Sequence, residues 1–515
     1  MPHHEPESPN PSSIPPSVFD VRSYGAVGDG HSLDTQPIQA TIDTCSRQGG
    51  GTVIFPEGVY LCGTILLRSR VTLHLTTGAT LLGSSNIQQY IPHTPATRSF
   101  INDQNDKSLI YAENESHIAI TGHGVIDGQG SEFSHIPIRQ YKQRPFVLRF
   151  AQCRHITIRN VTFKGGAMWT QWYLACHDIN INGIHVHSRI NSNNDGLNID
   201  GCDHTRINNC HIDSKDDCIV FKSTSNHMTT NAVVSNCTLT SDTNALKFGT
   251  ESYGGFKNIT VNNCIIHHTK KSGIDLRIID GGIIDGVTFS NITMSNVGVP
   301  IHICLGNIPR YFRRKSKTAQ PGFIRNIQLN NIHATKAGRA GCAIVGLPGR
   351  PIENISLNRI NLEFTGGGQV HDDILTNVPE AGQQYTSYWV NGTPPAYGLL
   401  VRHVNDLQVD DIQLRYTRKE DRCPMILNHI RRANIRQVWA DRSTSARAMI
   451  WLNQAVETSI QDCRCSKSPN PIVRIDGGES HAIRISTQAL TQNGALISLG
   501  DDVPSNVVKE IPQES

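Results

Sequence analysis

The sequence lacks several features that would assign it to a common class of protein. It has no run of eighteen apolar residues, so no membrane-spanning helix is predicted. Its 47 basic and 44 acidic residues leave a net charge of +3 without a block of one sign, which indicates neither nucleic acid nor a membrane surface as a partner. Its 14 cysteines form no CxxC cluster, which argues against a zinc site. We therefore expect no metal and no cofactor.

The beginning of the chain also lacks the apolar stretch of a signal peptide. Residues 1–17 contain six prolines and few apolar residues, so they are predicted to form a disordered tail. Two explanations stay open: the protein is not exported by that route and is cytoplasmic, or its leader is missing. No feature of the sequence indicates an oligomeric state.

What the sequence does contain is an internal repeat, which reads apolar, any, apolar, any, Asn, apolar, any, apolar. Most copies start 23 to 28 residues apart, and strict two-residue alternation within each copy indicates strands rather than helices. Copies of this phrase start at or within the stretches from Ile156, Ile179, Thr205, Ala232, Ile259, Val287, Ile327, Ile355 and Leu407.

A repeat of this length predicts a stack of coils. One unit is too short to bury its own apolar face, but coils stacked about 4.8 Å apart form parallel sheets around a shared core. We therefore expect an all-β, single-stranded parallel β-helix over residues 18–500, followed by a tail over 501–515. The one helical pattern, TQPIQATIDTCSRQ from Thr35, is expected to cap the first coil and cover its open edge.

Two columns of residues follow from stacking the copies. The sixth position of the phrase is always apolar, so Cys210, Cys237 and Cys264 are expected to be small core residues rather than metal ligands. The fifth position is usually asparagine, and stacked amides can hydrogen-bond along the axis. The asparagines in this column are therefore expected to be structural.

Stacking also brings three aspartates to one corner. The stretch Asp195-Gly-Leu-Asn-Ile aligns with Asp217-Cys-Ile-Val-Phe, so Asp195 and Asp217 become neighbours on adjacent coils, with Asp216 one residue away. A single aspartate at a turn is more often only a cap, but three in register are not explained by capping. Crowded carboxyls repel, which raises the pKa of at least one and allows an acid to stand beside a base. This combination is what cleavage of a glycosidic bond requires.

At this point the chain resembles the polygalacturonase family, glycoside hydrolase family 28, over nearly its full length. The resemblance is carried by SYGAVGDG, PEGVY, the NNDG and DDC motifs at Asp195 and Asp216, and the later FGTES and DGG phrases. It implies a right-handed, pectin lyase-like β-helix, an extracellular or periplasmic location, and hydrolysis with inversion. By resemblance, Asp216 is the general acid, and Asp195 with Asp217 positions and deprotonates the water.

The sequence departs from the family in two motifs. Thr243-Asn244-Ala245 stands where a typical polygalacturonase has Gly-His-Gly, so the helper histidine is missing. Asp275-Leu276-Arg277 stands where the family has Arg-Ile-Lys, which grips a galacturonate carboxylate. An aspartate cannot pair with a uronate, which puts ordinary endo-cleavage of polygalacturonan in doubt and favours a rhamnogalacturonan or a decorated oligosaccharide.

Polar residues near the corner are candidates for binding the sugar. The candidate substrate-binding residues are Asn194, Asn198, Lys222, Asn244, Lys247, Glu251, Asp275 and Arg277. Trp169 and Trp172 either stack on a sugar ring or pack a corner. Two long loops, HICLGNIPRYFRRKSKTAQPG and QQYTSYWVNG, are expected to close one end of the groove and make the enzyme exo-acting.

Two alternative functions remain open on the same fold. A polysaccharide lyase would abstract a proton beside a uronate and would usually need calcium and a basic residue. A non-catalytic carbohydrate-binding β-helix would need no acid beside a base, so the intact carboxylates argue against it. The predicted partner is in each case a polysaccharide or oligosaccharide.

Overall fold

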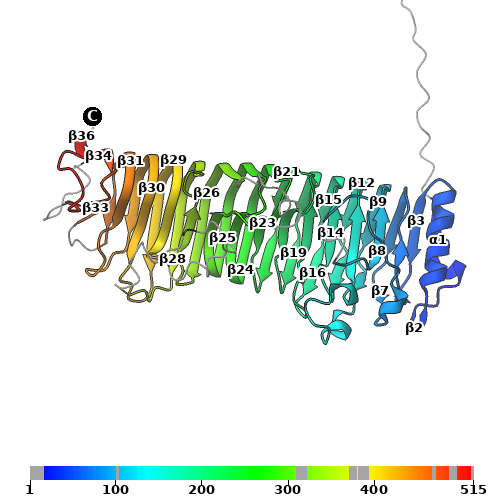
Figure 1. Cartoon of the computed structure of the whole chain (residues 1–515). Helices are drawn as coiled ribbons and strands as arrows, with labels where there is room; N and C mark the ends of the chain where they lie inside the picture. Colours follow the sequence, from blue (N-terminus) through cyan, green and yellow to red (C-terminus); the bar gives the residue numbers. More distant parts are fainter. Residues whose placement is uncertain are drawn as a thin grey trace, which may run out of the picture.

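The protein is an elongated stack of coils that runs from the N-terminal helix to the C-terminal strands (Figure 1). The computed structural model describes residues 17–99, 104–308, 322–369, 380, 394–466, 471–486 and 496–511. All pairings between its strands are parallel, which is the arrangement that the repeat predicted. None of the described helices is long and apolar enough to cross a membrane.

Three parallel sheets run along the stack, and most coils contribute a strand to each sheet. We call the first sheet the groove sheet, because the sequence predicts that the substrate groove runs along it. It contains β5 (Ile65–Leu66), β8 (Ser108–Glu113), β11 (Phe146–Ala151), β14 (Gln171–Leu174), β17 (Leu197–Asp200), β20 (Ile219–Ser223), β23 (Leu246–Ser252), β27 (Cys342–Val345), β33 (Val473–Asp476) and β35 (Ile497–Leu499).

The second and third sheets complete each coil. The second sheet contains β1 (Val18–Asp20), β3 (Gly51–Phe55), β6 (Val71–Leu75), β9 (Ser116–Gly122), β12 (Arg154–Arg159), β15 (His177–Asn182), β18 (Asp203–Asn208), β21 (Thr229–Ser235), β34 (His481–Ser486) and β36 (Val508–Ile511). The third contains β2 (Asp29–Leu33), β4 (Gly58–Cys62), β7 (Ala79–Gly83), β10 (Val125–Asp127), β13 (Thr162–Lys164), β16 (His185–Ser188), β19 (His211–Ser214), β22 (Thr238–Ser241) and β32 (Arg464–Cys465).

Seven long strands turn the corners without a break and belong to more than one sheet. They are β24 (Phe256–Ile278), β25 (Ile283–Leu305), β26 (Phe323–Ala337), β28 (Ile352–Phe364), β29 (Ala396–Tyr416), β30 (Cys423–Ala440) and β31 (Ile450–Gln461). The four 3₁₀ turns are η1 (Val21–Tyr24), η2 (Ile87–Gln89), η3 (Gly130–Phe133) and η4 (Tyr141–Gln143).

The N-terminal helix α1 (Thr35–Arg47) covers the first coil, as the sequence predicted. Its buried face, which includes Ile38, Ile42 and Cys45, packs against β1, β3, β5 and β6. At the other end, β36 pairs with β34, so strands continue past the boundary expected at residue 500. That boundary was set too early because the repeat phrase fades there, although backbone pairing does not depend on it.

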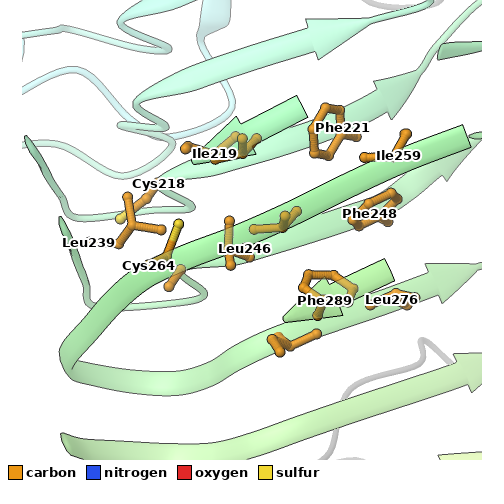
Figure 2. Packing of buried hydrophobic residues seen from close by; sticks show 14 of the residues in the cluster. Cys218, Ile219, Phe221, Leu239, Leu246, Phe248, Ile259, Cys264, Leu276 and Phe289 are labelled. Carbon is orange, nitrogen blue, oxygen red and sulfur yellow. The ribbon is translucent and has the colours of Figure 1, made fainter. Parts of the chain in front are cut away.

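The core consists of the apolar columns that the repeat predicted. Leu197, Ile219, Leu246 and Ile274 pair in register on successive coils and are buried. A second column places Phe221 against Phe248, with ring centroids 4.8 Å apart (Figure 2). This registry fixes the height of every outward side chain on the groove sheet.

The two columns of the repeat phrase are also present. Cys210, Cys237 and Cys264 are buried, free thiols. The asparagines form a ladder in which Asn236 donates to Asn209 at 3.3 Å, Asn291 donates to Asn263 at 3.0 Å and Asn331 donates to Asn291 at 2.8 Å. All of these asparagines have a positive φ, a conformation that asparagine tolerates better than most residues.

Candidate active site

The three aspartates of the repeated corner lie together where the groove sheet begins. Leu197 pairs with Ile219, and the Gly196 N–H donates to the Asp217 carbonyl at 2.8 Å, so Asp195 lies directly beside Asp217. Asp195 and Asp217 are each only 2% exposed, whereas Asp216 is half-buried and is the most accessible of the three. The registry predicted from the sequence is therefore confirmed.

Asp217 is held by three donors from the next coil. Lys247 Nζ lies 2.7 Å from Oδ2, and Asn244 Nδ2 donates to Oδ1 at 2.7 Å. The Thr243 hydroxyl lies 3.0 Å from the same Oδ1. Burial disfavours the charged form, but the ammonium groups of Lys247 and Lys222, with these hydrogen bonds, lower the pKa of Asp217. This aspartate is consequently the ionised member of the group.

The other two aspartates hold their protons more tightly than a free carboxyl group. Burial raises the pKa of Asp216, and the adjacent charge of Asp217 raises it further. Burial also raises the pKa of Asp195 well above its usual range, although Lys222 opposes this. The corner therefore combines one fixed carboxylate with two carboxyl groups that keep a proton to higher pH than a free carboxyl group does.

A second lysine lies between Asp195 and a glutamate. Lys222 Nζ lies 3.5 Å from Asp195 Oδ2, 3.0 Å from Glu251 Oε2 and 4.6 Å from the centroid of the Trp169 ring. Burial disfavours the ammonium form, but the Glu251 and Asp195 carboxylates outweigh it and raise the pKa of Lys222. Glu251, expected to bind a sugar hydroxyl, thus has Lys222 as a partner and keeps 15% of its side chain exposed.

Thr243 is a site residue that the sequence analysis missed. Its hydroxyl oxygen lies 2.8 Å from Asp216 Oδ1 and 3.0 Å from Asp217 Oδ1. A hydroxyl group has only one proton, so Thr243 can donate to only one of these two carboxylates at a time. The signal was present, because Thr243 directly precedes Asn244, which the alignment had placed next to Asp217. In the sequence alone, this motif indicates only the loss of a histidine.

The two predicted asparagines on the Asp195 coil are fully buried. Asn194 donates to the carbonyls of Gly166 and Met168 at 2.7 and 3.1 Å, and its Oδ1 accepts from the Asn191 N–H. Its side chain therefore fixes the shape of the corner. Asn198 donates to the Gln171 carbonyl at 3.1 Å, while its Oδ1 has no hydrogen-bond partner among the described residues.

Asp275 and Arg277, also predicted to bind substrate, lie against each other. Arg277 Nε donates to Asp275 Oδ1 at 2.8 Å, and His302 Nδ1 lies 2.8 Å from the same oxygen. All three side chains are at most 1% exposed. Although burial opposes ionisation, Arg277 and His302 lower the pKa of Asp275 to about 2. The two charges thus neutralise each other inside the protein.

The tryptophans before Asp195 pack on the outward face of the groove sheet, the floor of the expected groove. Trp169 and Trp172 are 5% and 0% exposed and form an edge-to-face pair. The Arg149 guanidinium lies 4.5 Å from the Trp172 ring centroid, and Trp172 Nε1 donates to Asp200 Oδ2 at 3.0 Å. Of the two roles expected for these rings, packing is the one that their burial fits.

A segment from an early coil covers this floor; we call residues 91–107 the strap, of which 100–103 lie outside the described residues. Arg149 donates to the strap carbonyls of His93 and Asn105 at 3.1 and 3.2 Å. Farther along, the Ser99 and Thr224 hydroxyls are 2.6 Å apart, although they are 125 residues apart in sequence. The strap therefore extends from the level of β8 to the end of β20. Most of the two long loops expected to close the groove lies outside the described residues.

Comparisons with known proteins agree with this geometry. A family model described as "Glycosyl hydrolases family 28" matches residues 45–384, about two thirds of the chain and the segment that holds every candidate residue of the corner. The chain belongs to glycosyl hydrolases family 28. Its resemblance to the polygalacturonase family is thereby confirmed.

Similar proteins include a "Probable polygalacturonase" of Vitis vinifera, 34% identical over 213 residues, which are 39% of this chain and 43% of that protein. An "Exopolygalacturonase" of Platanus acerifolia is 26% identical over 70% of this chain and 94% of its own. The chain thus spans less than half of the first relative and nearly all of the second. The exopolygalacturonase structure from Thermotoga maritima has a TM-score of 0.58 at 22% identity, covering 70% of this chain and 89% of that one. The chain shares the right-handed parallel β-helix of these solved structures.

Proposed function

We propose that the protein is a glycoside hydrolase that cleaves a pectin-related chain with inversion at the anomeric carbon. Family membership supports a glycosidase acting on pectin or galacturonan. The observation that carries the proposal is the buried corner in which Asp195, Asp216 and Asp217 meet Lys222 and Lys247.

The charges of the corner support a division of roles. Two lysines face four carboxyl groups, and a site this buried is most stable when its charges balance. Lys247 keeps Asp217 ionised, and Glu251 balances Lys222. Asp195 and Asp216 are then left to share protons, and each has a raised pKa.

The working state has one proton on Asp216 and none on Asp195. Asp216 donates its proton to the leaving oxygen as the glycosidic bond breaks. A water molecule attacks the anomeric carbon from the opposite face, and its proton passes to the Asp195 carboxylate. Asp217 remains charged throughout and stabilises the developing positive charge on the sugar ring. The Thr243 hydroxyl donates to the Asp216 carboxylate that remains after this proton transfer.

The substrate is the finer part of the proposal. Arg277 pairs with the buried Asp275, which also contacts His302, so the charge of Arg277 is not offered to a uronate. This observation supports a rhamnogalacturonan or a decorated oligosaccharide over plain polygalacturonan. A screen of defined pectic oligosaccharides with chromatography of products tests it. Fastest turnover of unsubstituted oligogalacturonides would contradict it.

The strap supports exo action. It contacts Arg149 on β11 and Thr224 at the end of β20, and between these two levels Trp172, Asn198 and Asp200 of the groove sheet are completely buried. A polysaccharide cannot continue along a floor that is covered in this way, so a chain end is expected to stop there. An exo enzyme releases products of one short length from the first minutes. A ladder of mid-sized products would overturn this part of the proposal.

The reaction class has its own test. Proton NMR of the first turnovers should show the product anomer opposite to that of the substrate linkage, with saturated sugar ends. A lyase would instead give products with unsaturated ends that absorb ultraviolet light, and adding a chelator would stop their formation. A carbohydrate-binding β-helix would retain the oligosaccharide without turnover. Either outcome would refute hydrolysis, and retention of the anomer would refute inversion.

A further inference from the structure

A group of two histidines and one aspartate lies on the outer face of the second sheet, around the corner from the catalytic strand β17. His177 begins β15 and pairs in register with Asp203, which begins β18 on the next coil, and His204 follows Asp203. The three side chains are 39%, 35% and 52% exposed. Among the residues that the structure describes, this is the one group of three or more possible metal-ligating side chains.

The three side chains converge on one point. Asp203 Oδ2 lies 3.2 Å from His177 Nδ1 and 2.7 Å from His204 Nδ1. One ligand atom from each residue lies within 4.8 Å of the other two. A tetrahedral ion with bonds of about 2.0–2.1 Å needs ligand atoms roughly 3.3 Å apart. The His177–Asp203 distance already matches that spacing, and the two exposed rings can rotate to bring their ligand nitrogens, at most 4.8 Å apart, to it.

The aspartate is already oriented from behind. Thr230 Oγ1 and Asn231 Nδ2, on the following coil, both donate to Asp203 Oδ1, at 2.6 and 2.8 Å. This leaves Oδ2 directed at the two imidazoles. Hydrogen bonds to the outer oxygen of a ligating carboxylate are the usual support of a metal site.

We propose that His177, Asp203 and His204 bind a divalent transition-metal ion of the zinc type, with water completing its coordination. Two imidazole nitrogens and one carboxylate oxygen suit zinc, nickel or copper better than magnesium or calcium. The ion joins two successive coils of the second sheet, so it stabilises the stack and takes no part in the hydrolysis. The sequence analysis could not find it, because His177 and Asp203 are 26 residues apart and meet only through the coil register.

The preceding coil supplies a matched control. There His155 Nδ1 lies 2.9 Å from Asp178 Oδ2, a similar contact between neighbouring coils. The Asp178 carboxylate, however, also pairs with the Arg206 guanidinium, so a cation already occupies the place of a second imidazole. A metal ion would be repelled there. Substitution of His155 therefore removes an exposed histidine–aspartate contact without removing a metal ligand.

The test is calorimetric titration of the full chain with zinc chloride, together with the visible absorption of bound cobalt(II). The background carries His3→Gln and His4→Gln, which remove two adjacent histidines from the start of the chain. We expect one ion per chain, a rise in the thermal midpoint with zinc, and at least a tenfold loss of affinity in His177→Gln and in Asp203→Asn. His155→Gln should bind as the background does.

Circular dichroism establishes that each variant is folded, and Asp203→Asn keeps the size of the side chain. The proposal is overturned if the background binds no zinc at 100 μM, a concentration about ten times a dissociation constant on the order of 10 μM. It is also overturned if zinc binds equally well to His177→Gln and Asp203→Asn, because the ion would then lie elsewhere, for example at the adjacent His267 and His268.

Discussion

Replacing Lys247 with methionine tests whether the catalytic corner is a buried network of charges. Lys247 and Asp217 are joined at 2.7 Å, and their side chains are only 9% and 3% exposed. Removing one partner of a buried pair leaves the other uncompensated and costs about 3–5 kcal/mol. If the whole chain of 515 residues unfolds in one step, its unfolding entropy of about 1.1 kcal/mol/K converts this loss to about 3–5 °C in the thermal midpoint.

The effect should depend on pH in a definite direction. The folded protein lowers the pKa of Asp217 below its value of about 3.9 in the unfolded chain. The Lys247–Asp217 pair therefore stabilises the fold fully above about pH 3.9, and this contribution is lost as the pH falls through the pKa of Asp217 in the folded protein. The difference between wild type and Lys247→Met should therefore be large at pH 7 and shrink below about pH 4. Urea denaturation at several pH values measures both quantities.

Lys270→Met is the matched control for this experiment. Lys270 Nζ lies 3.0 Å from Asp242 Oδ2, a similar pair between neighbouring coils, but its side chain is 69% exposed. Breaking such a surface pair should cost under about 1 kcal/mol. If Lys247→Met were no more costly than Lys270→Met, or if its cost did not shrink as the pH fell from about 4 toward the folded pKa of Asp217, the corner would not hold a buried, ionised Asp217.

Three other substitutions test separate parts of the structure. Thr243→Val removes a hydrogen bond that lowers the pKa of Asp216, so the alkaline limb of the pH profile of kcat/KM should move to higher pH. Thr243→Ser keeps the hydroxyl and should leave the profile in place, and an unchanged profile in Thr243→Val would show that this hydrogen bond does not set the pKa of Asp216. Asp275→Asn should lower the free energy of unfolding by about 3–5 kcal/mol at pH 7, as measured by urea denaturation. This loss should shrink as the pH approaches about 2, because the folded protein depresses the pKa of Asp275, and a loss independent of pH would contradict the account. Asn236→Ala should lower the free energy of unfolding by about 1–3 kcal/mol, because it breaks the asparagine ladder and places alanine at a φ of 56°. Thermal unfolding no different from that of the wild type would argue against a structural role of the ladder.

Registry explains why so much of the fold could be predicted from the sequence. In a parallel β-helix each residue has one neighbour on the coil before and one on the coil after, so an alignment of repeats is also a map of contacts. The pairing of Leu197 with Ile219 and the asparagine ladder follow directly from that map. The meeting of Asp195 with Asp217 follows from it as well.

The parts that could not be predicted depend on contacts outside the repeat. The sequence predicts that Asp275 and Arg277 bind substrate, yet they pair with each other and are buried beside His302. The strap reaches Thr224 from a coil more than a hundred residues earlier, and no periodicity encodes that contact. Thr243 was missed for a different reason, since its hydroxyl acts on two carboxylates whose exact positions depend on the turn between β19 and β20.

Asp216→Asn tests whether Asp216 supplies the proton to the leaving group. Asparagine keeps the size of the side chain and removes the acid, so turnover of the best pectic oligosaccharide should fall by about 10²–10⁴-fold while oligosaccharide binding by calorimetry stays within about threefold. Asp213→Asn, on the third sheet and paired with Arg189, should keep wild-type activity. If Asp216→Asn retained more than about a tenth of wild-type turnover, the assignment of the general acid would be wrong.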